Sequence, residues 1–396
     1  MDKYNKWVAM WGNAVSISEN RPEAYAKNIT LRYKIFCPFD GDALRLTFDN
    51  YCGTEEIHID KVTVMLDAKS YPVYFGEDDQ HGPGNDTDKN GVTIPAGENA
   101  VSREVIIPVK RGMTMLVNLY FKDYTQMRSS VYVQGPYTSG QYAIGDCCDV
   151  ENFDIEISRK TNICYFLSNI SVRTENKNRA IVCYGDSITA QDWPDYLLDK
   201  FVKNNIDNLS VVRRATSGSR ILRQYSCITY ESYGLMGKNR FEHEVPTDGA
   251  CAVIIQQGIN DIIHPVGTEV NPFRPMSDLP TVEELEQGLD MYIDLARKMG
   301  LKVVLGTLLP IEGWRTYADF REKMKNEFND YMRTNTECDG VIDFDKATRD
   351  SDNPKAFAPG CDSGDHLHPS ALGYETMAQA AYEYIVQNIK DFNGEE

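Results

Sequence analysis

Four short polar blocks in this sequence contain residue types that are suited to acyl transfer. They are Gly185-Asp186-Ser187, Thr216-Ser217-Gly218-Ser219, Gly258-Ile259-Asn260-Asp261 and Asp365-His366-Leu367-His368. A serine hydroxyl becomes a good nucleophile when an imidazole accepts its proton, and a carboxylate can orient that imidazole. Backbone N–H groups and a side-chain amide can stabilise the oxyanion of a tetrahedral intermediate. Each block alone is an ordinary turn or helix cap, but together they supply a nucleophile, a base and hydrogen-bond donors.

The elements around these blocks predict how the blocks meet. Predicted strands cover 180–185, 209–215, 252–258, 302–310 and 340–345, and predicted helices cover 193–203, 282–299, 318–335 and 371–388. Thr281 and Glu284 have the spacing of a capping box at the start of the second helix. Apolar strands that alternate with amphipathic helices indicate a parallel sheet covered on both faces. Because functional loops gather beyond the carboxyl ends of such strands, we expect all four blocks at one end of the sheet.

The first 176 residues follow a different pattern. Short runs rich in β-branched and aromatic residues lie at 43–51, 61–67, 103–109, 114–121 and 162–172, and no convincing helical period accompanies them. This pattern favours an antiparallel, jelly-roll-like β-sandwich. The polar segment 173–179 is typical of a linker. We therefore expect an all-β domain over residues 1–176 and an α/β domain over 177–396.

Taken in order, the four blocks strongly resemble those of the SGNH, or GDSL-type, hydrolase superfamily. The resemblance implies a flavodoxin-like parallel sheet and the hydrolysis of esters or thioesters. It further implies Ser187 as the catalytic nucleophile, His368 as the base and Asp365 as the partner of that base. The N–H groups of Ser187 and Gly218 and the side chain of Asn260 would form the oxyanion hole.

Two neighbouring residues compete for these roles. His366 lies close to His368, but it is adjacent to Asp365 in the sequence and is expected to point elsewhere. Asp362 competes with Asp365 as the orienting carboxylate. The D-x-x-H spacing from Asp365 to His368 matches the superfamily pattern without adjustment, so it is preferred.

A wider likeness spans nearly the whole chain. Segments 6–14, 45–59, 306–314 and 362–374 resemble a two-domain subgroup of bacterial carbohydrate acylesterases that carry a β-sandwich before the SGNH domain. This resemblance implies an acetylesterase that deacetylates plant-polysaccharide-derived oligosaccharides. The front domain would be structural or carbohydrate-binding, and the structural role is favoured.

Four further residues are candidates for substrate binding. Trp193 follows the nucleophile block and Trp314 follows the loop after the fourth strand, so either ring can stack on a sugar. Arg220 follows the glycine block and His264 follows the asparagine block, so both can line the substrate site. For Trp193, an alternative interpretation is a core residue that anchors the helix it begins.

The net charge excludes two classes of partner. The chain has 396 residues, with 41 Lys and Arg against 59 Asp and Glu, and a formal charge of −18. Nucleic acids and anionic membranes repel such a chain, so neither is an expected partner. The sequence shows no long amphipathic stretch suited to binding a membrane surface, which disfavours a lipase that acts at such a surface. A small-molecule or oligosaccharide ester fits, and the oligomeric state stays open.

The ten cysteines and the chain start bear on cofactors and location. No two cysteines form a C-x-x-C pair, so we expect no metal and no cofactor. The first residues lack the features of a signal peptide, which favours the cytoplasm. The alternative is a secreted protein whose leader has been removed.

Other functions compete with the small-acyl esterase. Within the superfamily, the alternative is a lysophospholipase or a thioesterase. Outside it, the alternative is a non-catalytic glycan-binding protein on a hydrolase scaffold. All the proposed catalytic side chains are present, which counts against this last alternative.

Overall fold

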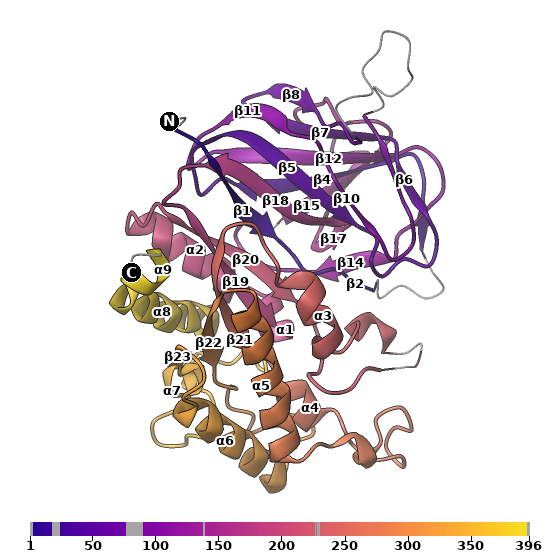
Figure 1. Ribbon diagram of the computed structural model, residues 1–396. Coiled ribbons are helices and arrows are strands. Elements are labelled where there is room, and N and C mark those ends of the chain that lie inside the picture. The colour runs from indigo at the N-terminus through magenta and orange to yellow at the C-terminus, as the bar shows by residue number, and fades with distance from the viewer. Residues whose placement is uncertain are drawn as a thin grey trace. The chain divides into compact units, whose positions relative to one another are not determined.

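Antiparallel strands make up the first part of the chain, and a parallel sheet with helices makes up the second part, as predicted (Figure 1). The computed structural model describes residues 3–17, 24–76, 90–137, 139–225, 227 and 230–393. The chain divides into two units, Met1–Asn178 and Arg179–Glu396, here called the N-terminal unit and the C-terminal unit.

Two larger antiparallel sheets form most of the N-terminal unit. The five-stranded sheet contains β1 (Lys6–Gly12), β18 (Leu167–Thr174), β5 (Gly41–Asp49) and β10 (Asn99–Val101) in that order, with β11 (Val105–Val109) also on β5. The six-stranded sheet runs β16 (Ser158–Thr161), β15 (Ser139–Ile144), β4 (Ile29–Phe36), β12 (Thr114–Phe121), β7 (Lys61–Leu66) and β8 (Lys69–Pro72). The smaller sheets are β17 (Ile163–Tyr165) with β14 (Ser129–Tyr132) and β2 (Ser16–Ile17), β13 (Thr125–Gln126) with β3 (Tyr25–Ala26), and β6 (Ile57–Ile59) with β9 (Val92–Ile94).

The predicted strands of this unit are present, with two differences. The run at 162–172 is divided into β17 and β18, because Phe166 between them has a φ of +62°, which interrupts the extended backbone. The central strand β4 was not predicted. Its outward positions carry Arg32 and Lys34 and so hide the apolar run, while Leu31 and Ile35 point into the core.

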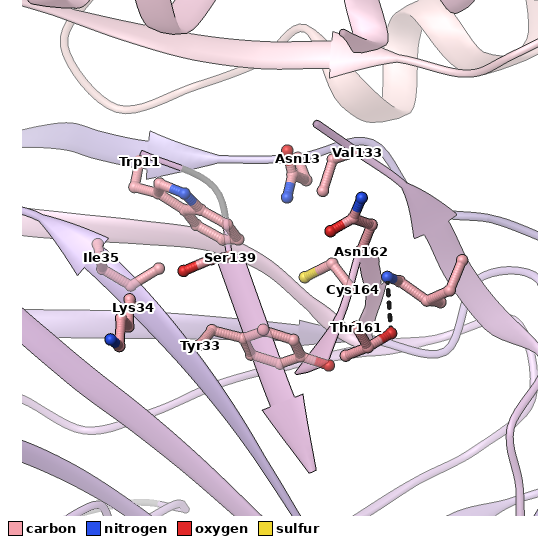
Figure 2. A pocket seen from close by; sticks show the side chains of 12 residues that line it. Trp11, Asn13, Tyr33, Lys34, Ile35, Val133, Ser139, Thr161, Asn162 and Cys164 are labelled. Carbon is pink, nitrogen blue, oxygen red and sulfur yellow. Dashed lines mark hydrogen bonds between the residues drawn. The ribbon is translucent and has the colours of Figure 1, made fainter. Parts of the chain in front are cut away.

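One pocket of the N-terminal unit is very small. A cavity of about 10 Å³ lies among residues that include Trp11, Tyr33 and Cys164 (Figure 2). A volume of this size holds about one water molecule. This cavity is therefore too small to bind a substrate.

The C-terminal unit is built on a parallel sheet. Its strand order is β20 (Leu209–Ala215), β19 (Arg179–Gly185), β21 (Ala250–Gln256), β22 (Lys302–Gly306) and β23 (Gly340–Ile342). The first strand of this unit thus lies between the second and the third, which is the flavodoxin-like order and confirms the predicted fold class.

Helices pack on this sheet. The four long helices are α2 (Trp193–Lys203), α5 (Val282–Lys298), α6 (Asp319–Thr334) and α8 (Ala371–Gln387), each within one residue of its predicted range. The shorter ones are α1 (Ser187–Ala190), α3 (Gly237–Glu244), α4 (Ile259–Ile263), α7 (Phe344–Thr348) and α9 (Ile389–Asn393), with 3₁₀ turns η2 (Glu231–Tyr233) and η3 (Met276–Asp278). Helix α2 packs on α8 and β20, whereas α5 packs on α3, α6 and β22. Within the described ranges, no helix combines the length and apolarity needed to span a bilayer.

Two predicted strands are shorter than expected. Strand β22 ends at Gly306, and the apolar residues after it form a buried loop. The Asn329 side chain accepts from the N–H of Leu308 at 2.7 Å and donates to its carbonyl at 2.8 Å, so it replaces a strand partner. Strand β23 ends at Ile342 because Asp343 caps α7 through the N–H of Lys346.

Candidate active site

Ser187 lies where a strand turns directly into a helix. Strand β19 ends at Gly185, and the Asp186 carboxylate accepts from the N–H of Ile188 at 3.1 Å, which caps α1. Ser187 is thus the first residue of the helix, where backbone N–H groups have no partner within the helix. The residue is 8% exposed, so it is held firmly but remains accessible.

A chain of hydrogen bonds joins Ser187 to a histidine and an aspartate. Ser187 Oγ lies 2.9 Å from His368 Nε2, and His368 Nδ1 lies 2.6 Å from Asp365 Oδ2. The other oxygen, Asp365 Oδ1, accepts from the N–H groups of Leu367 at 3.0 Å and His368 at 2.8 Å. With Nδ1 donating to the carboxylate, Nε2 is left as an acceptor for the serine hydroxyl.

The Asp365 carboxylate strongly prefers its charged form. Partial burial alone would raise its pKa, but the hydrogen bonds from the His368 side chain, the His368 N–H and the Leu367 N–H outweigh burial. They hold the pKa of Asp365 well below its usual range. A fixed negative charge at this position stabilises an imidazolium on His368.

The competing histidine has its own carboxylate. His366 Nδ1 lies 2.6 Å from Asp362 Oδ2, and the His366 ring packs against Gly313, where a Cβ atom would lie 2.7 Å from His366 Cγ. In the described parts of the chain, the Ser187 hydroxyl contacts His368 and not His366. The structure therefore brings together Ser187, His368 and Asp365, and separates the alternative pair from them.

The residues expected to donate to an oxyanion lie on loops that are tied to one another. The Thr216 N–H donates to the carbonyl of Gly185 at 3.2 Å, which links the loops after β19 and β20. Asn260 Nδ2 donates to the carbonyl of Ser219 at 3.1 Å, which links the loops after β20 and β21. That bond needs one of the two amide hydrogens of Asn260.

Gly218 needs its missing side chain. Its φ is +75°, and a Cβ atom would lie 2.3 Å from the Tyr233 ring. Any other residue at this position would displace Tyr233 and strain the loop. The close approach therefore holds the Gly218 backbone beside an aromatic ring.

Two buried aspartates anchor the site loops. Asp261 accepts from the N–H groups of Ile221 at 2.8 Å and Leu222 at 3.1 Å. Burial raises the pKa of Asp261 to about 6 even though these bonds oppose the shift. Burial likewise raises the pKa of Asp186 to about 7, against the hydrogen bond from Ile188.

Trp193 is not placed to stack on a sugar. The residue is 0% exposed, its Nε1 donates to Thr189 Oγ1 at 3.3 Å, and its ring lies 5.3 Å from that of Phe344. This position agrees with the alternative interpretation of Trp193 as a core residue that anchors its helix. An apolar ring at the start of α2 gains more by burial in the core than by exposure.

Arg220 and His264 belong to a cluster of rings near Gly218, which we call the tyrosine–histidine cluster and which also contains Tyr225, Tyr230 and Tyr233. The Arg220 guanidinium lies 3.9 Å from the centre of the Tyr225 ring, and Arg220 is 1% exposed. The His264 ring stacks on Tyr233 at 5.4 Å, and His264 Nδ1 is hydrogen-bonded to the Tyr225 hydroxyl. Burial, with help from neighbouring arginines, keeps the pKa of His264 well below its usual value, so its ring is neutral.

The sequence pattern does not predict that the tyrosines of this cluster lie near the site. They lie between the second and third blocks at no motif spacing, and their proximity to His264 comes from the fold.

Trp314 is half-buried, with Arg315 stacked on it at 4.6 Å, and it follows Gly313, on which His366 packs. The structure thus places Trp314 beside the loop that carries the histidines.

The described part of the chain contains no cluster of three or more His, Cys, Asp or Glu side chains arranged for a metal ion. All ten cysteines are free thiols.

The C-terminal half of the chain is similar to known proteins. No curated protein matches the chain. Among solved structures, a GDSL-like lipase from Bacteroides thetaiotaomicron is 18% identical, with 53% of this chain and 89% of that chain covered and a TM-score of 0.38. An acetylxylan esterase from Geobacillus stearothermophilus is 18% identical, with 52% of this chain and 94% of that chain covered and a TM-score of 0.39. The model of the GDSL-like lipase/acylhydrolase family matches residues 183–376, so the C-terminal half of this chain is a GDSL-like (SGNH) acylhydrolase domain.

Proposed function

We propose that this protein is a serine esterase that removes small acyl groups, above all acetyl, from plant-polysaccharide-derived oligosaccharides. The observation that carries the proposal is the hydrogen-bonded chain from Ser187 through His368 to Asp365. An acylhydrolase domain with this chain has an activated hydroxyl and a base whose orientation is fixed.

In the proposed reaction, Ser187 Oγ attacks the carbonyl carbon of the ester while His368 Nε2 accepts the hydroxyl proton. The oxyanion binds to the N–H groups of Ser187 and Gly218 and to the Asn260 amide. The intermediate collapses, the sugar alcohol leaves with the proton from His368, and the acyl group stays on Ser187. Water then attacks this acyl-enzyme with His368 as base, which releases the acid and restores the serine.

The surroundings of Gly218 support a small acyl group and a hydroxylated alcohol. Tyr233 packs directly on Gly218, so large rings crowd the side of the expected oxyanion hole. The same cluster carries hydroxyl, imidazole and guanidinium groups, with Arg274 stacked on Tyr230 at 5.0 Å. Such groups hydrogen-bond a sugar better than they pack on a lipid chain.

The ten free thiols support the proposed cytoplasmic location. Disulfides form and persist in oxidising compartments, whereas cytoplasmic thiols stay reduced. A protein exported through an oxidising compartment with ten cysteines would be expected to pair some of them.

The first test measures kcat/KM on p-nitrophenyl esters of increasing acyl length. We expect p-nitrophenyl acetate to be hydrolysed much faster than the long-chain esters. Ser187→Ala should lower kcat/KM at least about a thousandfold. Ser210→Ala, which removes a buried β20 hydroxyl, is the matched control and should keep wild-type activity.

The second test measures acetate release from acetylated oligosaccharides, with Ser187→Ala as blank. Faster turnover of long-chain or thioester substrates would favour a lysophospholipase or thioesterase instead. Absence of turnover on every ester, together with glycan binding, would favour the non-catalytic alternative. Equal activity of Ser187→Ala and wild type would refute the assigned nucleophile.

A further inference from the structure

A groove of about 610 Å³ lies on one face of the six-stranded sheet of the N-terminal unit. It is lined by side chains of β4, β7, β12 and β15 and of the segment 151–153, and we call it the sheet groove. We propose that the sheet groove binds a short, uncharged oligosaccharide. All its lining residues belong to the N-terminal unit, so this is a second site, separate from Ser187.

The alternation of β4 creates the polar floor of the groove. Leu31 and Ile35 are buried in the core, whereas Arg32 and Lys34 face the groove. Gln141 of β15 pairs with Arg32 and so presents its side chain on the same face. A strand with charged and amide side chains on its outer face is suited to binding a hydrated ligand.

Arg32 fastens the segment 147–153 over this floor. It is 2% exposed, and it donates to Asn118 Oδ1 at 2.6 Å, to the Glu151 carbonyl at 2.8 Å and to the Cys147 carbonyl at 3.2 Å. Among the described residues its hydrogen bonds go to neutral oxygens rather than to carboxylates. The guanidinium thus acts as a rigid tie between strand and segment.

The same tie positions an aromatic ring. The Arg32 guanidinium lies 3.8 Å from the centre of the Phe153 ring, and Phe153 is half-buried and lines the groove. A ring held by a fixed cation loses little freedom when a ligand binds, so it is a preorganised platform. The C–H face of a pyranose is apolar and matches such a ring.

The residues that line the groove supply hydrogen-bonding groups of both kinds. Lys34 donates, Asp67 accepts, and the Gln141 and Asn152 amides do both, as sugar hydroxyls require. Arg32 and Lys34 are balanced in charge by Asp67 and Glu151, which favours a neutral ligand over an ion. The groove volume falls within the range of about 300–1,000 Å³ that is typical of small-ligand sites.

A glycan site on the N-terminal unit would serve the proposed esterase by tethering it to its polymeric substrate. Two linked sites raise the effective concentration of the substrate at the second. This role rests on the proposed function, but binding itself does not. An inactive esterase should bind equally well.

The test uses isothermal titration calorimetry on full-length Ser187→Ala protein with xylohexaose, cellohexaose and mannohexaose. We expect at least one to bind with a Kd of about 1 mM or tighter. In the same background, Phe153→Ala should weaken that binding at least about tenfold, in line with the removal of an aromatic anchor. Tyr124→Ala is the matched control, because Tyr124 is 70% exposed, lies outside the groove and should leave Kd unchanged.

A second variant separates lost binding from lost folding. Gln141→Ala removes a groove amide without touching the Arg32 tie, and it should weaken binding about threefold or more while the unfolding transition stays at its wild-type position. No binding of the three hexasaccharides would overturn the proposal. So would an unchanged Kd in both Phe153→Ala and Gln141→Ala. The titrations use the Ser187→Ala protein, so their outcome does not depend on whether the wild-type protein proves to be an esterase.

Discussion

Asp186 and Asp365 sit on the two loops that meet at Ser187, and they prefer opposite charge states. Asp365 accepts four hydrogen bonds at a partly exposed position, and those from His368 and Leu367 depress its pKa. Asp186 is fully buried, one of its oxygens has no hydrogen-bond partner among the residues that the structure describes, and burial raises its pKa to about 7. The environment thus assigns a permanent charge to Asp365 and a titrating one to Asp186.

The raised pKa of Asp186 predicts a pH-dependent stability. The unfolded carboxyl loses its proton near pH 4, whereas the folded one keeps it until about pH 7. The native state therefore binds more protons between these values, and the free energy of unfolding falls as pH rises through this window. Asp186→Asn keeps an acceptor for the Ile188 N–H but does not titrate.

Urea unfolding at pH 4.5 and pH 7.5 measures this effect. The wild type should lose more stability than Asp186→Asn between the two pH values. Asp261, whose pKa is also raised, is present in both proteins, so its contribution to the pH dependence of stability cancels in the comparison. A difference between the two proteins that is the same at both pH values would contradict a raised pKa of Asp186.

His264 is predicted to be a fixed hydrogen-bond donor. Burial raises the pKa of the Tyr225 hydroxyl, so this hydroxyl keeps its proton and donates to His264 Nδ1, which leaves the proton of the neutral ring on Nε2. Since His264 follows Asn260 by one helical turn, their side chains lie on the same side of the helix, and we expect this N–H to face the substrate site. Without the Tyr225 hydroxyl, the proton of the neutral His264 ring can occupy either nitrogen. Tyr225→Phe should therefore raise KM for acetylated oligosaccharides about five- to tenfold with a smaller change in kcat.

The control for this variant is Tyr331→Phe, which removes a hydroxyl bonded to Asp290 on another part of the unit. It should leave both kinetic constants unchanged. An unchanged KM in Tyr225→Phe, or an equal rise in the control, would show that His264 does not position the substrate.

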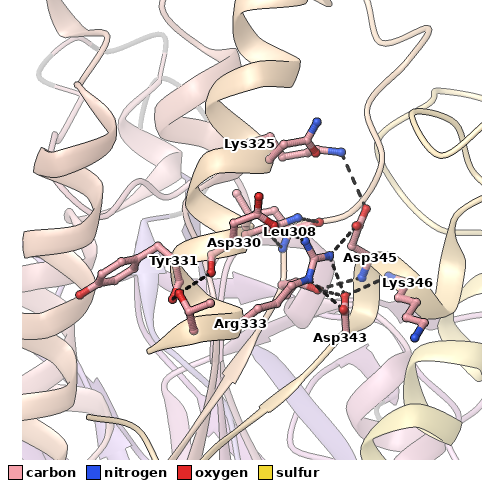
Figure 3. Close-up of polar contacts among 12 residues, drawn as sticks. Leu308, Lys325, Asp330, Tyr331, Arg333, Asp343, Asp345 and Lys346 are labelled. Carbon is pink, nitrogen blue, oxygen red and sulfur yellow. Dashed lines mark hydrogen bonds and ion pairs between the residues drawn. The ribbon is translucent and has the colours of Figure 1, made fainter. Parts of the chain in front are cut away.

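At the scale of elements, a largely buried charge network fixes helix α6 to the segment that follows β23 (Figure 3). Lys325 is 0% exposed and lies 3.0 Å from Glu322 and 3.8 Å from Asp345. Arg333, further along the helix, pairs with Asp345 at 2.7 Å and Asp343 at 2.9 Å. The network joins the first half of α6, through Glu322 and Lys325, and its last turn, through Arg333, to the N-cap and first turn of α7.

Removing the buried lysine of this network should destabilise the C-terminal unit. Lys325→Met leaves Glu322 and Asp345 buried without Lys325, which typically costs about 3–5 kcal/mol in the free energy of unfolding. Lys323→Met on the same helix breaks an exposed pair with Glu327 and should cost less than about 1 kcal/mol. Urea unfolding compares the two, and equal losses would contradict a structural role for the network.

At the scale of the whole molecule, the proposed chemistry and the proposed glycan site are divided between the two units. Ser187, Gly218, Asn260, Asp365 and His368 all belong to Arg179–Glu396. Each unit has its own buried apolar residues. This division is expected of domains that carry separate functions.

A fragment of residues 179–396 is therefore expected to hydrolyse p-nitrophenyl acetate within about threefold of the full chain, since its core and site residues are its own. It should lack the hexasaccharide binding that Phe153→Ala weakens, because the sheet groove is absent from it. Circular dichroism checks that the fragment is folded. A folded fragment without esterase activity would mean that the N-terminal unit contributes to catalysis.

Much of the C-terminal unit could be predicted from local pattern. The four long helices and the capping box of Thr281 and Glu284 follow from periodicity and cap chemistry. Strand β4 could not be predicted in this way, because Arg32 and Lys34 are stabilised by partners from other segments or by solvent. The buried loop after β22 could not be predicted either, because Asn329, which satisfies its backbone, lies on α6.

The sequence by itself determined the order of the sheet strands and long helices of the C-terminal unit and the four blocks, because turns, caps and hydrophobic periods are set by residues a few positions apart. It also singled out Ser187, Asp365 and His368. Only the tertiary structure decided that His368 rather than His366 meets Ser187, a contact across 181 positions. It also enclosed Trp193, gathered the tyrosine–histidine cluster and formed the sheet groove. These features depend on contacts between distant segments, and no local pattern specifies which distant surfaces will pack together.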